Sequence, residues 1–429
     1  MLESKFLNGE KIFYGWWIVF ISMFGISTGA APFIFASLGL FILPFNEEFG
    51  WNRAQISAIL PVLIVAFMIS MPLAGRLIDR IGTRKVLIPS TIAFGLGLAA
   101  IPTFVSELWH LALIFLFVGT CGVAANTQPY LRTISAWFNK KRGLAIGIAV
   151  SGIGLGYAYV PILVQSVINV AGWRSAYYVL SGFVIFAAVP LITIFLKESP
   201  AEIGQIPDGT KRIQAISGSE STSVGLTSSL AIRQKDFWLL SLIFLCIAFV
   251  LHGILPHLVP MLRDRGVSAD TAAIVASVMG GTVFVSRILI GYIIDYFFAP
   301  RVALYFFALS AIGFFILSAS SFLPMLYLAV IMIGLSLGAE IDLLAYLCGK
   351  YFGLRSFGEI YGLLFVGVLI GSAFGPVTFG YGFESTGSYS GILFVSAMVN
   401  IVALIILTRL GPYPDLTEFP SIRVSDRLS

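Results

Sequence analysis

Charged side chains are scarce in this sequence. Asp, Glu, Lys and Arg make up 11% of its 429 residues, whereas a soluble globular protein carries about 25%, because its surface must be solvated by water. Hydrophobic residues make up 58%, and the mean hydropathy is +0.96. These proportions exclude a soluble fold and predict that most of the surface faces lipid.

Residues that build catalytic and metal centres are also few. The chain has three histidines and three cysteines. The cysteines, Cys121, Cys246 and Cys348, stand apart inside apolar stretches, where they are typical of small core residues. The sequence contains no nucleotide-binding loop, no metal-ligand spacing and no buried set of histidine, acid and nucleophile at one depth. It therefore predicts neither an enzyme nor a bound cofactor.

Long hydrophobic runs are abundant and recur along the whole chain. Each is about 20 residues or longer, the length that an α-helix needs to cross a bilayer, whereas an outer-membrane barrel would show short alternating segments. We expect an all-α membrane protein with twelve transmembrane helices. They are predicted at residues 14–45, 52–75, 84–105, 108–138, 142–169, 173–196, 237–262, 271–296, 300–321, 324–350, 356–384 and 388–409.

Basic residues are distributed unevenly among the segments that join these spans. Of the 26 lysines and arginines, four would lie outside if the N-terminus is cytoplasmic, and two lie within spans, which leaves 20 inside. The four are Arg53, Arg174, Arg263 and Arg265, and the two are Arg132 and Arg287. Because cytoplasmic loops carry an excess of Lys and Arg, both termini are predicted to be cytoplasmic, in a plasma (bacterial inner) membrane. The net charge of +5 is thus explained by topology, and nucleic-acid binding has no support.

The chain repeats itself around a polar linker. Residues 216–223 have the composition of a flexible linker and favour a division into an N-terminal bundle (1–200), a cytoplasmic linker (201–236) and a C-terminal bundle with a short tail (237–429). Five identities occur at an offset of 215 residues. They are Gly119 and Gly334, Gly143 and Gly358, Gly147 and Gly362, Gly156 and Gly371, and Pro161 and Pro376. An offset of six spans indicates two pseudo-symmetric six-helix bundles with the same orientation.

A charged motif joins the second and third spans. Residues 75–85, GRLIDRIGTRK, resemble the loop motif of the major facilitator superfamily at nearly every position, and a weaker copy ends at Asp295. This resemblance implies the major facilitator fold. It also implies a cytoplasmic gate in which Asp79, Arg80, Arg84 and Asp295 latch the two halves. A charge-assisted network of this kind breaks when the halves move apart.

Further stretches resemble the monocarboxylate transporters and the related oxalate:formate antiporters. They are residues 14–17 (YGWW), 126–131 (NTQPYL), 137–147 (WFNKKRGLAIG), 338–343 (GAEIDL) and 350–353 (KYFG). The sequence departs from these subfamilies in two ways. Val283 stands where animal monocarboxylate transporters have an aspartate one turn before an arginine, and neither the first nor the eleventh span contains their lysine.

Several polar residues lie at a similar depth inside predicted spans. They are Asn126, Arg287, Glu340 and Asp342. Charge inside a bilayer costs a few kcal/mol per residue, so each buried ionisable group marks a candidate site. Arg287 stays protonated and offers a planar fork of donors that matches a carboxylate. The alternative is a structural ion pair of Arg287 with either acid.

The acidic pair suggests coupling to protons. Two carboxylates beside one arginine leave a net negative layer, which favours protonation of one of them. Glu340 and Asp342 point about 200° apart on a helix, so only one can face the pathway. Asp342 shares its face with Tyr346, whereas Glu340 would brace a neighbouring helix. His252 is an alternative proton carrier, or a core histidine.

We therefore expect a secondary active transporter that moves a small organic anion, most simply a monocarboxylate such as lactate or pyruvate, by proton-coupled alternating access. Its substrate site is expected to include Asn126, Tyr130, Arg287 and Tyr346, and its proton site Asp342, Glu340 or His252. The partners would be the anion, the proton and the bilayer, and the monomer would be the functional unit. A carboxylate exchanger of the oxalate:formate type and an efflux pump for hydrophobic compounds remain alternatives, although the pump would leave Arg287 without a role.

Overall fold

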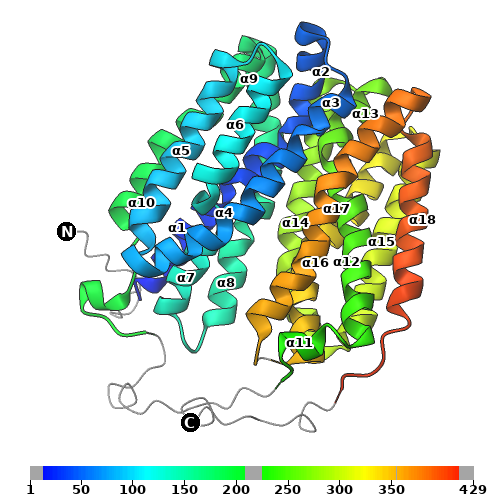
Figure 1. Cartoon of the computed structure of the whole chain (residues 1–429). Coiled ribbons are helices and arrows are strands. Elements are labelled where there is room, and N and C mark those ends of the chain that lie inside the picture. Colours follow the sequence, from blue (N-terminus) through cyan, green and yellow to red (C-terminus); the bar gives the residue numbers. More distant parts are fainter. Residues whose placement is uncertain (1–12, 208–224, 354, 415–429) are drawn as a thin grey trace. The chain divides into compact units, whose positions relative to one another are not determined.

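The structure is a computed structural model that describes residues 13–207, 225–353 and 355–414 (Figure 1). The described residues are almost entirely helical. They contain no β-strand, and the one bridge of that type joins Gly225 to Gly353. This confirms the all-α fold class.

Ten helices in the described part of the chain are long and apolar enough to cross a membrane. One of them, Arg142–Phe195, has 54 residues, which at a rise of about 1.5 Å per residue is more than twice the thickness of the hydrocarbon core. Gly172, with a φ of 77°, interrupts it, so it supplies two spans. The shorter apolar helix Leu108–Cys121 begins the remaining span. The protein thus crosses the membrane many times, in agreement with the twelve predicted spans.

The chain forms two compact units. Unit 1 consists of Met1–Pro44 and Val62–Ile216, and unit 2 consists of Phe45–Pro61 and Ser217–Ser429. Each unit contains six spans by this division. The short segment Phe45–Pro61 belongs to the second unit although both its neighbours in the chain belong to the first, and nothing in the sequence predicted this exchange.

Unit 1 begins with a span that is not a continuous α-helix. Residues 28–37 interrupt it, and they contain the π-helical stretch η1. The elements of this unit are α1 (Gly15–Ser27), η1 (Ala31–Ala36), the first part of α2 (Leu38–Phe49), most of α4 (Ile59–Ile81), α5 (Thr83–Phe104), α6 (Leu108–Cys121), η2 (Val123–Ala125), α7 (Thr127–Trp137), α8 (Arg142–Val150), α9 (Gly152–Gly182), η3 (Phe183–Ala188), α10 (Val189–Phe195) and η4 (Pro200–Ile203).

Unit 2 contains ten complete helical elements in the described part of the chain. They are α3 (Arg53–Ser57), α11 (Ser228–Ala231), α12 (Lys235–Ile254), η6 (Leu255–His257), α13 (Leu258–Asp264), α14 (Ala269–Tyr296), α15 (Ala299–Ala319), α16 (Leu323–Phe352), α17 (Phe357–Thr386) and α18 (Ser390–Leu407). In this unit α12 packs along α17, and α14 packs along α16. Helix α12 also contacts α16, so ionisable residues of α12, α14 and α16 meet in this unit.

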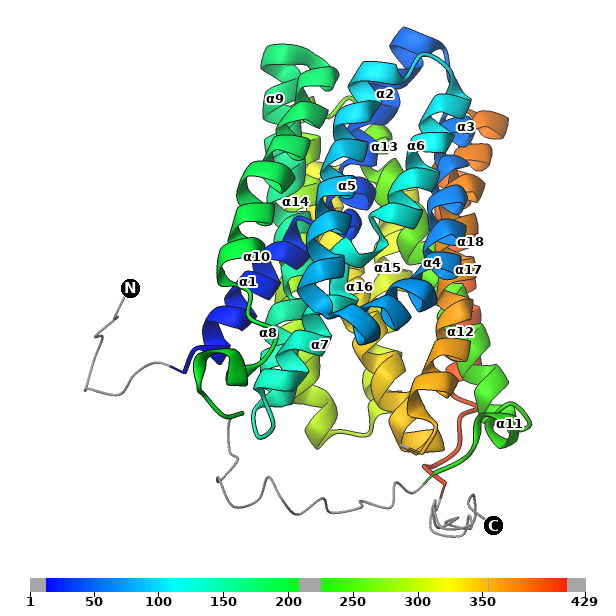
Figure 2. The same cartoon turned by 60° about the vertical axis from the view of Figure 1, so that its left-hand side comes forward.

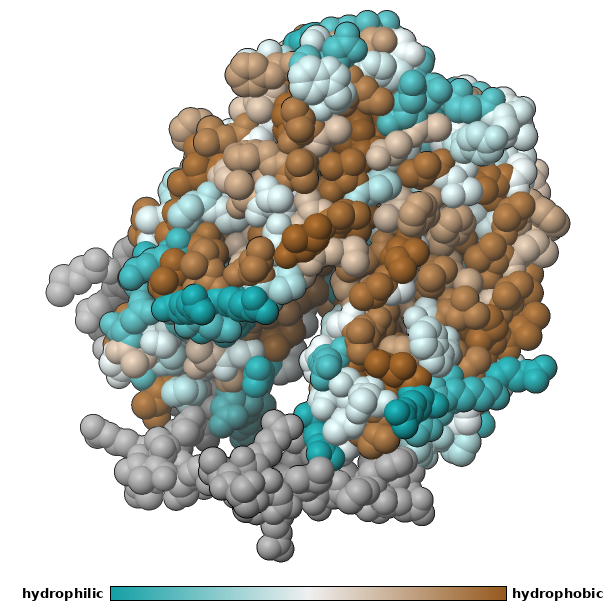
Figure 3. Space-filling model, in the orientation of Figure 1, coloured by the Kyte–Doolittle hydropathy of each residue, from teal (hydrophilic) through white to brown (hydrophobic). Residues whose placement is uncertain are grey.

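The surface of each unit is that of a membrane-embedded protein. In the space-filling view, hydrophobic side chains cover the flanks, and hydrophilic side chains gather toward the ends of the helices (Figure 3).

Helix α4 bends along its length (Figure 2) and contains Pro72, which cannot donate the backbone hydrogen bond of a helix interior. It continues to Ile81, past the predicted end of the second span at residue 75, so part of the charged motif is helical.

The fourth span is broken, which corrects the prediction of one continuous helix at 108–138. The break lies between Cys121 and Thr127, where α6 ends and α7 begins. Ser90 of α5 lies beside it, and its Oγ donates to the Cys121 carbonyl (2.6 Å) and accepts from the Ala124 amide (3.0 Å). A broken helix at membrane depth needs such partners, because lipid offers its backbone none.

Candidate functional site

Two glycines set the spacing between α14 and α16 in unit 2. A Cβ added at Gly334 would lie 2.8 Å from the Met279 carbonyl oxygen, and one at Gly338 would lie 2.6 Å from the Ser286 Cβ. The backbones can approach this closely only because neither residue has a side chain. Asp342 lies one turn beyond Gly338 on α16, so the same close packing brings it to α14.

Arg287 of α14 faces Asp342. Its Nη1 lies 3.4 Å from both carboxylate oxygens, which is longer than the usual range of about 2.7–3.2 Å for such a bond. The guanidinium is buried, with its side chain only 5% exposed, whereas that of Asp342 is 33% exposed. The buried Nε of Arg287 has no hydrogen-bond partner among the described residues. The arginine is thus only loosely paired and keeps unused donors.

Glu340 points to another helix. Its Oε2 lies 3.2 Å from Nε2 of His252, which belongs to α12. Glu340 is completely buried, and its other oxygen, Oε1, is without a hydrogen-bond partner in the described part of the chain. Burying a carboxylate with one oxygen unpaired is costly unless the carboxyl group holds a proton or a charged partner balances it. The two acids of α16 therefore have separate partners, as their angular separation on the helix predicted.

Two tyrosines extend this layer. Tyr346 lies one turn beyond Asp342, and its ring centroid is 5.4 Å from the Lys350 ammonium. Tyr361 of α17 lies within electrostatic range of Arg287, Asp342 and Glu340. Sequence reasoning missed Tyr361 because it carries no charge and has no special spacing; only the packing of α17 brings it to the other three residues.

In unit 1, Asn126 lies in the break of the fourth span. It precedes α7, and its Nδ2 donates to the Val123 carbonyl at 3.1 Å. The side-chain oxygen does not cap α7. Asn126 is therefore held by the irregular backbone of the break, beside the first turn of α7.

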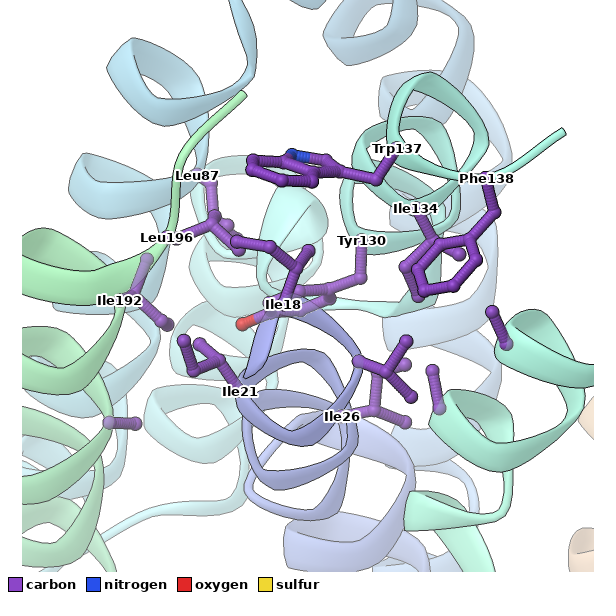
Figure 4. Close-up of a cluster of buried hydrophobic side chains, with 14 residues drawn as sticks. Ile18, Ile21, Ile26, Leu87, Tyr130, Ile134, Trp137, Phe138, Ile192 and Leu196 are labelled. Atoms are coloured by element: carbon purple, nitrogen blue, oxygen red, sulfur yellow. The ribbon is translucent and has the colours of Figure 1, made fainter. Parts of the chain in front are cut away.

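Tyr130, the other residue of unit 1 expected at the site, is part of a hydrophobic cluster. Its side chain is 1% exposed and packs with Ile18, Ile21 and Trp137 (Figure 4). A Cβ added at Gly25 would overlap the Tyr130 hydroxyl, so α1 approaches the ring closely. This environment favours a packing role for Tyr130.

The charged motif of unit 1 forms contacts within that unit. An Asp79 oxygen lies 3.1 Å from Nη2 of Arg132 on α7, and Nη1 of Arg132 also donates to the Ile78 carbonyl at 2.9 Å. The sequence placed Arg132 within a span and named no partner for it. Its partnership with Asp79 became visible once α7 was placed against α4.

The remaining gate residues have different environments. Arg84 donates its backbone amide to the Glu198 carboxylate at 2.8 Å and its guanidinium to the Thr193 carbonyl. Arg80 is exposed and makes no hydrogen bond or ion pair within the described ranges. Asp295 lies in α14, but its side chain is outside the described residues. The gate between the halves stays a prediction.

Comparison with known proteins agrees with this architecture. A family model described as Major Facilitator Superfamily matches residues 15–376 and 239–425. Monocarboxylate transporter 12 of Rattus norvegicus is 24% identical over 418 residues, which cover 92% of this chain and 85% of that protein. Monocarboxylate transporter 11 of Homo sapiens is 26% identical over 395 residues, which cover 89% and 80%.

A solved structure has the same fold. The crystal structure of a bacterial homolog to the human lysosomal transporter Spinster, in an inward-facing and occupied conformation, superposes with a TM-score of 0.69 at 18% identity. The match covers 93% of this chain and 97% of that one. With the family match along almost the whole chain, these findings show that the protein belongs to the Major Facilitator Superfamily of membrane transporters.

Proposed function

We propose that this transporter carries a small monocarboxylate together with a proton, by alternating access, and that Arg287 binds the carboxylate. The observation that carries the proposal is the state of Arg287. It is buried within α14 and loosely paired with Asp342, and its Nε has no hydrogen-bond partner among the described residues. An arginine with unused donors in an apolar surrounding is suited to a planar anion, because its fork can donate two parallel hydrogen bonds.

The balance of charge favours one carboxylate per substrate. Arg287 is the only lysine or arginine in the described parts of α12, α14, α16 and α17 apart from residues near the helix ends. A dianion would leave one negative charge without a partner at a depth where charge is expensive. The similarity to proteins named monocarboxylate transporters supports the same substrate class.

Asp342 is proposed as the acid that links substrate to proton. While it is ionised, it competes with the substrate for the Arg287 guanidinium. When it binds a proton, the ion pair is lost and the guanidinium becomes available to the substrate carboxylate. Proton and anion then bind together and cross as a neutral pair, which avoids carrying a net charge through the membrane potential.

The pair of His252 and Glu340 provides a second place for a proton. The two side chains are held on different helices at 3.2 Å, and one proton shared between them leaves the pair neutral or zwitterionic. Asn126, in the break of the fourth span, is proposed to offer an amide to the substrate, and Tyr346 and Tyr361 are proposed to offer hydroxyls. The functional unit is proposed to be a monomer in the plasma membrane, with both termini cytoplasmic.

Transport by purified protein tests this proposal. Uptake of labelled lactate, pyruvate, formate and oxalate into proteoliposomes is measured with and without an inward proton gradient. We expect gradient-driven uptake of the monocarboxylates, and loss of at least 90% of it in Arg287→Gln. Arg263→Gln, which removes an exposed arginine of the same unit, serves as the matched control and retains uptake.

Two results would overturn parts of the proposal. Unchanged carboxylate uptake in Arg287→Gln removes the site assignment. The proton role of Asp342 is removed if wild-type uptake does not depend on the proton gradient and is accelerated by unlabelled carboxylate inside the vesicles. That result identifies an exchanger.

A further inference from the structure

The segment Phe45–Pro61, called the strap below, crosses from unit 1 to unit 2 and back. Both of its boundaries lie at prolines. Pro44 is inside α2, and Pro61 is in the first turn of α4. A proline inside a helix removes a backbone hydrogen bond and allows a bend. Pro44 therefore allows the strap to change its angle to the first part of α2 while its own structure is preserved.

The strap has an ordered structure of its own. Asn52 caps α3 by accepting from the Gln55 amide at 2.8 Å, and the Gln55 side chain accepts from the Asn52 amide at 2.9 Å. This reciprocal pair is a capping box, which fixes where a helix starts. Asn46 donates to the Trp51 carbonyl at 2.9 Å and closes the preceding turn. The strap is thus a preformed element that can dock and undock as one piece.

Arg53 is the main charged contact of the strap with the rest of unit 2. Its two terminal nitrogens donate to the two oxygens of Asp264 at 2.5 and 2.8 Å. The guanidinium lies 3.8 Å from the centroid of the Phe383 ring, and the Arg53 amide donates to Glu384 at 3.1 Å. Figure 1 shows α3 beside α13 at one end of this unit. A bidentate ion pair whose buried guanidinium also stacks on an aromatic ring is a strong contact.

His257 is the centre of the second contact, and it is completely buried. Its Nε2 lies 2.8 Å from the Pro376 carbonyl and 3.1 Å from the Ser57 hydroxyl of the strap. Its Nδ1 lies 2.8 Å from the Tyr389 hydroxyl. A carbonyl oxygen can only accept, so we assign the single proton of the neutral ring to Nε2. Nδ1 then accepts from the Tyr389 hydroxyl.

These bonds form one directed chain. Arg53 donates to the Tyr389 oxygen at 3.1 Å, Tyr389 donates to Nδ1 of His257, and Nε2 donates to Pro376 and faces Ser57. The backbones are also close, since a Cβ added at Gly380 of α17 would lie 2.7 Å from the Cα of Ala54. Docking the strap therefore requires a neutral His257.

Four charged or titratable groups act on His257 or on its partner Tyr389. They are Arg53 of the strap, Asp264 at the end of α13, Glu384 of α17 and Tyr389 before α18. Asp264 already neutralises Arg53, and Glu384 is exposed. A second proton on His257 would place a new positive charge near Arg53, with only the Tyr389 hydroxyl between the two side chains. Nδ1 would then carry a proton and could no longer accept the hydrogen bond from the Tyr389 hydroxyl.

We propose that His257 is a proton-binding site, separate from the Arg287 layer, and that its protonation releases the strap from unit 2. The ligand is a proton that reaches His257 from the aqueous side at the Arg53 end of the unit. Neutral His257 holds the strap docked, and protonated His257 breaks the donor chain from Arg53 to Pro376. Release would separate the strap from α13, α17 and Tyr389, the parts of unit 2 that it contacts.

The distance between the strap and unit 2 tests this directly. In a background with Cys121, Cys246 and Cys348 replaced by serine, spin labels are attached through Ala58→Cys and Ser385→Cys, two exposed positions. Pulsed electron paramagnetic resonance is recorded in lipid nanodiscs at pH 8 and at pH 5 without substrate. We expect one short distance at pH 8 and, at pH 5, a second, longer distance that is absent at pH 8.

Variants identify the residue responsible. In His257→Gln and His257→Asn, each of which keeps a donor and an acceptor but cannot take a second proton, the short distance is expected at both pH values. His110→Gln, a substitution of the partly exposed histidine of unit 1, is the control and should behave as the wild type. A wild-type distance that does not change with pH overturns the proposal, as does a response that persists in both His257 variants. Neither result bears on carboxylate transport, because no substrate is present.

Discussion

Replacing Asp342 with asparagine should tighten carboxylate binding at neutral pH rather than weaken it. The substitution copies the protonated acid and removes a competitor for Arg287. At the 3.4 Å that separates Nη1 from the carboxylate, two unit charges interact by about 5 kcal/mol at an effective dielectric constant of about 20. One third of the Asp342 side chain is exposed, so solvent screening lowers this ceiling to about 1–2 kcal/mol. That corresponds to roughly a five- to thirty-fold lower Kd.

Binding of pyruvate to the detergent-purified protein, followed by calorimetry from pH 5.5 to 8.5, measures this effect. Wild-type affinity is expected to rise as the pH falls, because protonation of Asp342 frees Arg287. Asp342→Asn should bind with one high affinity across the range and lose gradient-driven uptake while keeping exchange. Glu359→Gln, an acid-to-amide change at an exposed position of α17, is the control. Weaker binding by Asp342→Asn, or an unchanged pH profile, would refute the reasoning.

Two further predictions concern packing and the charged motif. A Cβ added at Gly338 would lie 2.6 Å from the Ser286 Cβ, so Gly338→Val should lower the melting temperature by several degrees and abolish substrate binding. In the control Gly362→Ala, no atom lies within 4 Å of the added Cβ, and the melting temperature should not fall. Thermal unfolding in detergent measures both. A double-mutant cycle of Asp79→Asn and Arg132→Gln, measured by chemical unfolding, gives the interaction free energy of this pair. We expect it to be below about 1 kcal/mol, because the Asp79 side chain is 72% exposed and solvent screens the pair. A larger interaction free energy would contradict this screening.

The sequence predicted the features that follow from composition and period. Scarce charge, long apolar runs and the uneven distribution of basic residues lead to a many-span helical membrane protein, because lipid permits few other solutions. The separation of Glu340 from Asp342 also followed from helix geometry alone. What the sequence could not give were the partners, since pairing of Glu340 with His252 depends on the packing of α12 against α16.

The breaks in regular structure were harder to predict. The stretch from Leu108 to Phe138 is apolar enough for one helix, and only the contacts of Ser90 with the backbone explain how a break can exist there. The strap was missed for a similar reason. Arg53 was read as a loop charge that reports topology, whereas its bidentate pairing with Asp264 needs a contact across 211 positions of sequence.

The break between α6 and α7 limits how this protein can evolve. The Ser90 hydroxyl forms hydrogen bonds with the Cys121 carbonyl and the Ala124 amide, two main-chain groups of the fourth span. It therefore depends on the backbone conformation of residues 121–126 and not on which side chains they carry. Ser90→Ala would leave both main-chain groups without this hydrogen-bond partner. A continuous helix would satisfy them internally, so the substitution favours a continuous fourth span. In such a helix the Asn126 side chain would point in a different direction. A lineage could therefore lose the site without changing any residue that touches substrate, and a search for inactive homologues should examine position 90 alongside Arg287.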